Sequence, residues 1–340
     1  LFPSFRRRGG RQSRTGWLLA TQRKPKARPT GNHSTPPREG HKSQIQPAVH
    51  ASSGTVSDPP APPHKTPQKG LFMHFTTLEV ERKGAVPTVW MNRPTVHNAF
   101  NETLIAELTQ AFVGLDGEDS VRLVVLAGRG KSFSAGADLN WMRAAADYSE
   151  EKNRADALAL ARMLKTLHRM SKPTIAKVHG SAFGGGTGLT AACDIAIATD
   201  TAQFALSEVR LGLIPATIGP YVADAIGWRQ ARRYFLTAER IDAQTALRLG
   251  LVHEVCPEAE LDARVATVGV ALLHGSPHAQ AEAKQLLADL RGGSPQDDSL
   301  LEKTAWHIAR VRTHPEAREG LTAFLEKRSP VWVSSLSKKP

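Results

Sequence analysis

Three consecutive glycines, Gly184 to Gly186, stand before a short helical pattern, and a single carboxylate, Glu208, follows farther along the same stretch. Backbone without side chains at the start of a helix presents free N–H groups and the positive end of the helix dipole to an anion or a carbonyl oxygen. A carboxylate near such donors can move a proton to or from a bound molecule. Close packing of a strand against a helix also favours glycine, and a surface Glu208 paired with Arg210 would have no chemical role. The stretch alone leaves these alternatives open.

A second turn of small residues strengthens the chemical interpretation. Ala135, Gly136 and Ala137 lie between an apolar strand pattern and a helix pattern, and Asp138 can cap that helix. Turns that follow parallel strands meet at one edge of a sheet, where ligands bind in open α/β folds. If the amides of the two turns converge, they form a two-donor oxyanion hole, which stabilises negative charge on an oxygen. Nucleotide binding is disfavoured, because Thr187 stands where a P-loop needs lysine and the dinucleotide-binding spacing of glycines is absent.

Strand and helix patterns alternate around these two turns. Strands are expected at 76–82, 85–94, 121–128, 174–180 and 194–199, and helices at 100–115, 156–170 and 187–193. The first helix can begin at Asn101, and its apolar face contains Leu104, Ile105, Leu108, Phe112 and Leu115. Such alternation indicates an α/β fold with parallel strands. After about residue 228 the pattern is only helical, except that "HEVC" at 253–256 is interpreted as a last strand rather than a catalytic pair.

The first 72 residues differ from the rest in charge and composition. They hold 13 of the 44 Lys and Arg residues, only two acidic residues and 11 of the 22 prolines, so the remainder carries 31 basic against 30 acidic groups. Such a segment cannot bury enough apolar surface to fold, and we expect 1–72 to be disordered. It is interpreted first as an artefact of the gene start, second as an Arg-rich targeting peptide, and third as a nucleic-acid-binding arm. The nearly neutral remainder gives no indication of a nucleic-acid partner.

Cysteine usage and hydropathy exclude other classes of protein. Cys193 and Cys256 are too few and too far apart for a disulfide framework or a zinc site, and both lie in apolar surroundings. Core thiols are typical of a reducing compartment, and we expect a cytoplasmic location. No apolar run approaches the ~20 residues of a membrane helix, so no membrane partner is expected. No spacing of His and carboxylate residues suggests a metal site.

Five stretches occur in the order and at the spacing of one known family. They are NRPTVHNAFN (92–101), GRGKSFSAGADL (128–139), VHGSAFGGGTGLTAACDIAIAT (178–199), AQFALSEVRLGLIP (202–215) and EGLTAFLEKRSPVW (319–332). Together they resemble the enoyl-CoA hydratase/isomerase (crotonase) family over about residues 76–332. The resemblance implies an α/β fold: a spiral of ββα units over 73–265, and a C-terminal helical region over 266–340 that forms trimers, which often pair into hexamers. It also implies an acyl-CoA thioester substrate, with coenzyme A as part of the substrate and no separate cofactor.

The same resemblance assigns roles to individual residues. The backbone amides of Ala137 and Gly185 match the pair that holds the thioester carbonyl, and Glu208 matches a catalytic glutamate. The residues that match the path of coenzyme A and its pantetheine arm are Val96, Ala99, Ala135, Asp138 and Leu139. Lys327 matches a basic residue that can reach the CoA phosphates, and a solvated lysine at a helix end is an equal alternative.

One position departs from the family's two-carboxylate hydratases. They carry a second glutamate just after the glycine run, where this chain has Gly188. One glutamate can in principle take a proton from water and deliver it to Cα, and isomerases of the family use one glutamate to move a proton between Cγ and Cα. The segment 205–227 and the glycine at 188 look most like bacterial hydratases of methylglutaconyl-CoA and related branched glutaconyl-CoAs. Glycine here predicts a wider pocket, suited to a branched or carboxylated acyl group.

The sequence therefore predicts an enoyl-CoA hydratase, a lyase that adds water across the 2,3-double bond, in leucine or branched-acid breakdown. Two alternatives stay open. One is a Δ3–Δ2 enoyl-CoA isomerase, since a single glutamate suffices there. The other is a weakly catalytic acyl-CoA-binding or RNA-interacting family member, which the basic first 72 residues would support.

Overall fold

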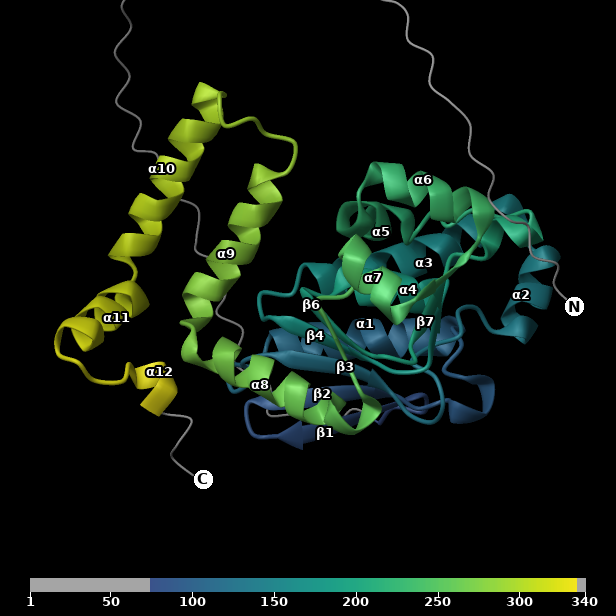
Figure 1. The fold of residues 1–340 in the computed structure, drawn as a ribbon, viewed down its shortest axis with the longest axis horizontal. Coiled ribbons are helices and arrows are strands. Elements are labelled where there is room, and N and C mark those ends of the chain that lie inside the picture. Colours follow the sequence, from purple (N-terminus) through teal and green to yellow (C-terminus); the bar gives the residue numbers. More distant parts are fainter. Residues whose placement is uncertain (1–73, 335–340) are drawn as a thin grey trace, which may run out of the picture. The chain divides into compact units, whose positions relative to one another are not determined.

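The computed structural model describes residues 74–334, which contain two β-sheets (Figure 1). The larger sheet has the strand order β1-β2-β3-β4-β6-β9, and the smaller has the order β5-β7-β8. The strands are β1 (Leu78–Lys83), β2 (Val86–Met91), β3 (Val124–Gly128), β4 (Thr174–Val178), β5 (Ser181–Phe183), β6 (Ile195–Thr199), β7 (Gln203–Ala205), β8 (Arg240–Asp242) and β9 (Glu254–Cys256). From β2 onward all neighbours in the larger sheet are parallel, as the alternating pattern predicts. The expectations for residues 1–72 lie outside the described residues.

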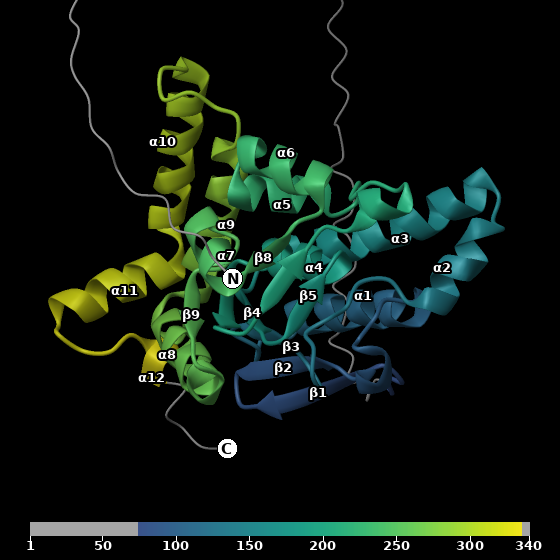
Figure 2. The ribbon, with the colours of Figure 1, turned by 45° about the vertical axis from the view of Figure 1, so that its right-hand side comes forward.

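Helices connect these strands. They are α1 (Glu102–Asp116), α2 (Leu139–Ala146), α3 (Glu150–His168), α4 (Gly185–Ala192), α5 (Gly219–Ile226), α6 (Trp228–Thr237), α7 (Ala243–Leu249), α8 (Leu261–His274), α9 (Pro277–Leu290), α10 (Asp298–Thr313), α11 (Pro315–Leu325) and α12 (Val331–Ser334). Three 3₁₀ helices complete the set: η1 (Pro94–Val96), η2 (Glu208–Leu211) and η3 (Glu258–Glu260). Figure 2 shows the smaller sheet beside α4, which contacts both β5 and β7.

The larger sheet is buried on both faces at its central strand β3, which has no polar side chain. In β3, Val124 and Leu126 point into the main core, whereas Val125 points into a second cluster with Leu261 and Val265 of α8. All five residues of β3 are buried. A continuous apolar strand is typical of this arrangement, with helices over both faces.

The helix predicted from Asn101 is confirmed. The Asn101 side chain accepts a hydrogen bond from the amide of Leu104 and caps α1. The predicted apolar face of α1 is buried in the main core. This helix fixes the chain just after Phe100, a residue that lies at the functional site.

The helical expectation after about residue 228 is wrong at β8. This three-residue strand pairs antiparallel with β7, and only Ile241 of its three residues is buried. A strand of three residues is too short to show an alternating pattern of apolar residues. It forms because it pairs with β7. The strand expected at 253–256 is confirmed as β9. The predicted boundary at 265/266 falls inside α8, which packs on β4 and β6.

The helices after α8 bury little within the chain. α9 is joined to the sheet region by Lys284, whose Nζ lies 2.7 Å from Oδ2 of Asp194. Large apolar side chains on α10 and α11 are exposed, among them Trp306 (73%) and Phe324 (80%). Within residues 74–334 no helix is long and apolar enough to cross a membrane.

Candidate functional site

The two turns of small residues lie against each other. Residues 132–134 run parallel to 181–183: Ser134 N–H donates to the Ser181 carbonyl (3.0 Å), and Phe183 N–H donates to the Ser134 carbonyl (2.9 Å). This pairing brings Gly136 next to Gly184, and a Cβ added at Gly184 would lie 3.8 Å from the Gly136 Cα. Both glycines have positive φ (94° and 49°), which other residues rarely adopt. The two turns therefore lie together at one edge of the sheets.

The amide of Ala137 is free to meet a ligand. Phe100 N–H donates to the Gly136 carbonyl (2.7 Å), and Asp138 N–H donates to the Phe100 carbonyl (2.8 Å). These two bonds form a parallel bridge between Phe100 and Ala137, which turns the Ala137 N–H to the side away from Phe100. No group in the described part of the chain accepts a hydrogen bond from this amide, and Ala137 is exposed.

The amide of Gly185 is the second donor. Gly185 is the first residue of α4, so its N–H has no partner within the helix. The helix dipole adds positive potential at this end. Gly184 N–H, by contrast, donates to the Ala205 carbonyl of β7 (2.8 Å), which anchors the turn to the smaller sheet. Each of the two adjoining turns therefore carries one N–H group without an acceptor among residues 74–334, and an oxyanion hole needs two such donors.

Glu208 lies beside these donors. Its Oε1 would be 3.3 Å from a Cβ at Gly184, and its Oε2 is buried with no hydrogen-bond donor among residues 74–334. Burial raises the pKa of the Glu208 carboxyl above its ordinary value, against a smaller opposing effect of its own backbone N–H. No ion pair joins Glu208 to Arg210. The alternative of a surface pair is therefore wrong, and Oε2 of Glu208 is shielded from solvent.

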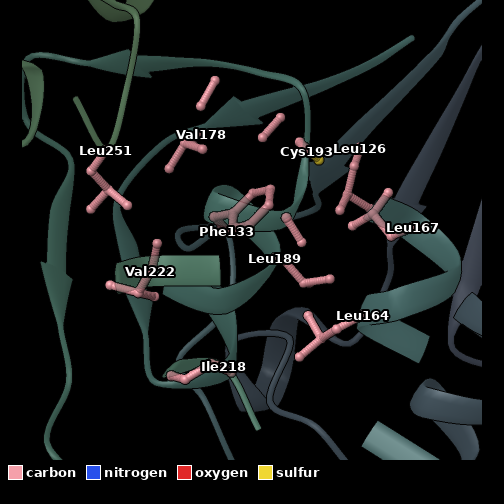
Figure 3. Packing of buried hydrophobic residues seen from close by; sticks show 14 of the residues in the cluster. Leu126, Phe133, Leu164, Leu167, Val178, Leu189, Cys193, Ile218, Val222 and Leu251 are labelled. Atoms are coloured by element: carbon pink, nitrogen blue, oxygen red, sulfur yellow. The ribbon is translucent and has the colours of Figure 1, made fainter. Parts of the chain in front are cut away.

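The expectation of a wider pocket at Gly188 is wrong. Ile218 fills the space: a Cβ added at Gly188 would lie 2.3 Å from its Cγ2 and 2.8 Å from its Cβ. Gly188 is buried in α4, and Ile218 is 2% exposed. Figure 3 shows Ile218 near Val222 and Leu189, which belong to the same core cluster. An aliphatic side chain, not open space, replaces the second carboxylate of two-carboxylate hydratases.

The residues expected along the CoA path differ in exposure. Val96 and Leu139 are exposed (39% and 69%), Ala135 is half-buried, and Ala99 is buried. Lys327 is exposed and follows α11, which packs against α9 and α10.

One cleft lies away from the predicted site residues. It has a volume of about 780 Å³ between α1, α2 and α3, and its walls include Ile105, Trp141 and Arg162. None of the predicted site residues lines it. In the part of the chain that the structure describes, no three His, Cys, Asp or Glu side chains are grouped to hold a metal ion.

The chain is similar to known proteins in sequence and in fold. The sequence profile of the enoyl-CoA hydratase/isomerase family matches residues 81–335. The chain belongs to this family. An enoyl-CoA hydratase from Shewanella pealeana, whose crystal structure is known, is 47% identical in sequence to this chain. The two structures superpose with a TM-score of 0.74, and the match covers 76% of this chain and 96% of that one. The predicted crotonase fold is confirmed.

Two curated relatives have different named reactions. The short-chain-enoyl-CoA hydratase of Clostridium acetobutylicum is 31% identical, covering 75% of this chain and 97% of its own length. The 4-chlorobenzoyl coenzyme A dehalogenase-2 of an Arthrobacter species is 32% identical, covering 74% of this chain and 91% of its own length. Membership of the enoyl-CoA hydratase/isomerase family therefore leaves the reaction to be argued from the site.

Arg93 is a site residue that the sequence did not single out, although it lies in the NRPTV stretch. Its Nη2 lies 2.9 Å from Oδ2 of Asp138, and both side chains are largely buried (18% and 9% exposed). Its Nη1 donates to the Ala99 carbonyl. Asp138 Oδ1 accepts from the Asn140 amide (2.8 Å), which confirms the predicted cap of α2. Arg93 thus ties Asp138, the residue after Ala137, to the segment around Ala99 and Phe100 that pairs with Ala137.

Replacing Arg93 with Ala is expected to destabilise the fold by about 3 kcal/mol at pH 7, because it leaves the Asp138 carboxylate buried without its cation. Burial raises the pKa of Asp138, but the Asn140 amide and Arg93 outweigh it, so the pKa lies below its ordinary value. This stabilisation is present above the ordinary carboxyl pKa and is lost as pH falls through the lowered value. Urea unfolding at pH 7 and at a pH well below the ordinary aspartate pKa of ~3.9 measures both effects. An equal loss at both pH values would contradict the ion-pair account.

Proposed function

We propose that this protein is an enoyl-CoA hydratase that uses one glutamate and two backbone donors. The observation that carries the proposal is the buried Oε2 of Glu208, without a donor in the described residues, beside the Gly136–Gly184 junction. The free amides of Ala137 and Gly185 follow directly after these two glycines. A general base next to an oxyanion hole is the equipment needed for chemistry at Cα or Cβ of a thioester.

The reaction follows from these positions. Glu208 takes a proton from water as the water oxygen forms a bond to Cβ. The electron pair of the 2,3-double bond moves towards the thioester and places negative charge on the carbonyl oxygen. The amides of Ala137 and Gly185 stabilise that charge without reorganising. The pair then returns to Cα, which takes the proton from Glu208, so one water is added and the carboxylate is restored.

For the acyl group we propose a branched or carboxylated enoyl chain, such as methylglutaconyl-CoA in leucine or branched-acid breakdown. The similarity of residues 205–227 to such hydratases supports this choice. Because Ile218 occupies the position of the second carboxylate, the protein has one fewer polar group to hold the water. A carboxylate on the substrate itself would supply it.

A Δ3–Δ2 enoyl-CoA isomerase is the second candidate, and the same single carboxylate favours it. Glu208 would remove a proton from Cα of a 3-enoyl thioester and deliver it to Cγ, and no water takes part. With Ile218 packed against Gly188, position 188 supplies no second carboxylate, and this reaction needs none.

An absorbance assay separates the two reactions. The full chain is mixed in turn with 3-methylglutaconyl-CoA, crotonyl-CoA and a 3-enoyl-CoA, and the absorbance of the conjugated enoyl thioester is followed. A hydratase removes this absorbance from the first two, and we expect the fastest loss with 3-methylglutaconyl-CoA. Formation of the absorbance from the 3-enoyl-CoA, without any loss from the others, would overturn the hydratase proposal in favour of the isomerase.

We also propose a cytoplasmic homo-oligomer, a trimer or a pair of trimers. Exposed apolar side chains such as Trp306 and Phe324 favour burial against another copy. In such an assembly Lys327 would approach the CoA phosphates of a neighbouring copy. The buried free thiols of Cys193 and Cys256 suit a reducing compartment. Light scattering of the purified chain gives the number of copies, and a monomer would contradict this proposal.

A further inference from the structure

Phe100 contacts both halves of the proposed oxyanion hole. Its side chain is 1% exposed and belongs to the main core, and its residue directly precedes the cap of α1. Its backbone makes both hydrogen bonds that bracket Ala137, one to the Gly136 carbonyl and one from the Asp138 amide. The direction of the Ala137 N–H therefore depends on where the Phe100 backbone lies.

The ring of Phe100 contacts the second donor residue. A Cβ added at Gly185 would lie 2.4 Å from Cε2 of the ring and 2.7 Å from Cδ2. Real Cβ atoms do not approach so closely, so the ring occupies the space that a side chain at 185 would need. The ring thus limits how closely the start of α4 approaches the bridge at Ala137.

We infer that Phe100 is the positioning residue of the oxyanion hole, because it sets the separation of the two donor amides. Its backbone holds Ala137, and its ring holds Gly185 at a fixed distance from that backbone. The inference rests on the proposed function only in that the two amides bind a thioester carbonyl. Donors of this kind must meet the oxygen with correct geometry, and small displacements of catalytic groups reduce rates strongly.

Phe100→Leu tests the inference, since it keeps the backbone bonds and removes the ring atoms that contact Gly185. Phe112→Leu is the matched control: Phe112 is fully buried in the same core cluster on α1 and is not among the contacts of the site glycines. We expect kcat to fall by about tenfold or more in Phe100→Leu. Complete removal of one donor lowers kcat by about 10²–10³-fold, and displacing a donor should cost less than that. KM should change little, and Phe112→Leu should keep kcat. Phe100→Met, whose longer unbranched side chain reaches farther towards Gly185 than leucine does, should lose less.

A second readout reports the donors themselves. The infrared stretch of a ¹³C-labelled thioester carbonyl moves to lower frequency when two N–H groups polarise it. We expect this displacement to shrink in Phe100→Leu and to persist in Phe112→Leu. Equal effects of the two variants on kcat, or an unchanged carbonyl frequency in Phe100→Leu, would overturn the inference.

Crystal structures of the two variants separate this inference from the proposed function. Phe100→Leu is expected to displace Gly185 N relative to Ala137 N, and Phe112→Leu is not. If the unaltered protein neither converts nor polarises any enoyl-CoA, the proposed function fails, and the two structures still decide whether Phe100 sets the separation. Unmoved amides in Phe100→Leu would reject the positioning role whatever the substrate.

Discussion

Replacing Glu208 with Gln is expected to lower kcat by about 10⁴-fold and to leave the protein at least as stable as before. General acid–base catalysis by one side chain contributes about 10²–10⁴ in rate. The upper end applies, because the same carboxylate removes the first proton and delivers the second. Gln keeps the shape of the side chain but takes up no proton, so binding of the substrate should be almost unchanged. The assay with the preferred enoyl-CoA measures kcat and KM together.

The stability of this variant follows from the direction of the pKa shift. Burial raises the pKa of Glu208, so the folded protein disfavours the ionised form. The fold is therefore most favoured at low pH, where Glu208 is protonated in the folded and the unfolded chain, and it loses stability as pH rises through the raised pKa. Gln removes that loss. We expect an equal or higher Tm than the unaltered protein at pH 7, and a smaller difference near pH 4.

The pH dependence of kcat/KM gives an independent check. Activity should fall on the acid side with a midpoint above the ordinary glutamate value of about 4.3, because only the ionised carboxylate accepts a proton from water. Glu239→Gln is the matched control: this carboxylate pairs with Arg233 at 2.7 Å on the surface and should affect neither activity nor the profile. A Glu208→Gln protein that kept its activity, or that lost stability at pH 7, would contradict the role assigned to this residue.

Much of the fold could be predicted because its elements carry a clear period or a continuous apolar run. α1 shows a helical stripe and a capping Asn101, and β3 is apolar at each position. β8 could not be predicted, because three residues show no period and the strand forms through pairing with β7. α3 begins at Glu150, whereas the sequence pattern placed its start at 156. The first turns of α3 are polar, so the apolar pattern did not reveal them, and Ser149 caps the helix.

The site was predictable in its backbone and less so in its side-chain contacts. Small residues at Gly136 and Gly184 revealed two turns with free amides, and the family resemblance identified Glu208. The contacts of Phe100 with Gly185 and of Ile218 with Gly188 join residues far apart in the sequence. A glycine in a helix shows that something approaches closely, but the sequence does not say which residue does so.

Gly188→Glu is expected to destabilise the protein by about 3 kcal/mol or more. Its Cβ would overlap Cγ2 of Ile218, which is fully packed in the core, and overpacking alone costs about 1–3 kcal/mol. The new carboxylate would also be desolvated, which adds a cost unless it finds a donor. Urea unfolding compares it with Gly188→Ala, which has the overlap without the charge and should lose less stability.

The double variant Gly188→Glu/Ile218→Ala tests whether these two positions share one space. Ile218→Ala alone should cost about 2–5 kcal/mol, because it leaves a cavity in the core. The glutamate side chain would fill that cavity, so the double variant should be more stable than the sum of the single losses by about 1–3 kcal/mol. Strict additivity of the losses would show that the two side chains do not compete, and Ile218 would then not explain the glycine at 188.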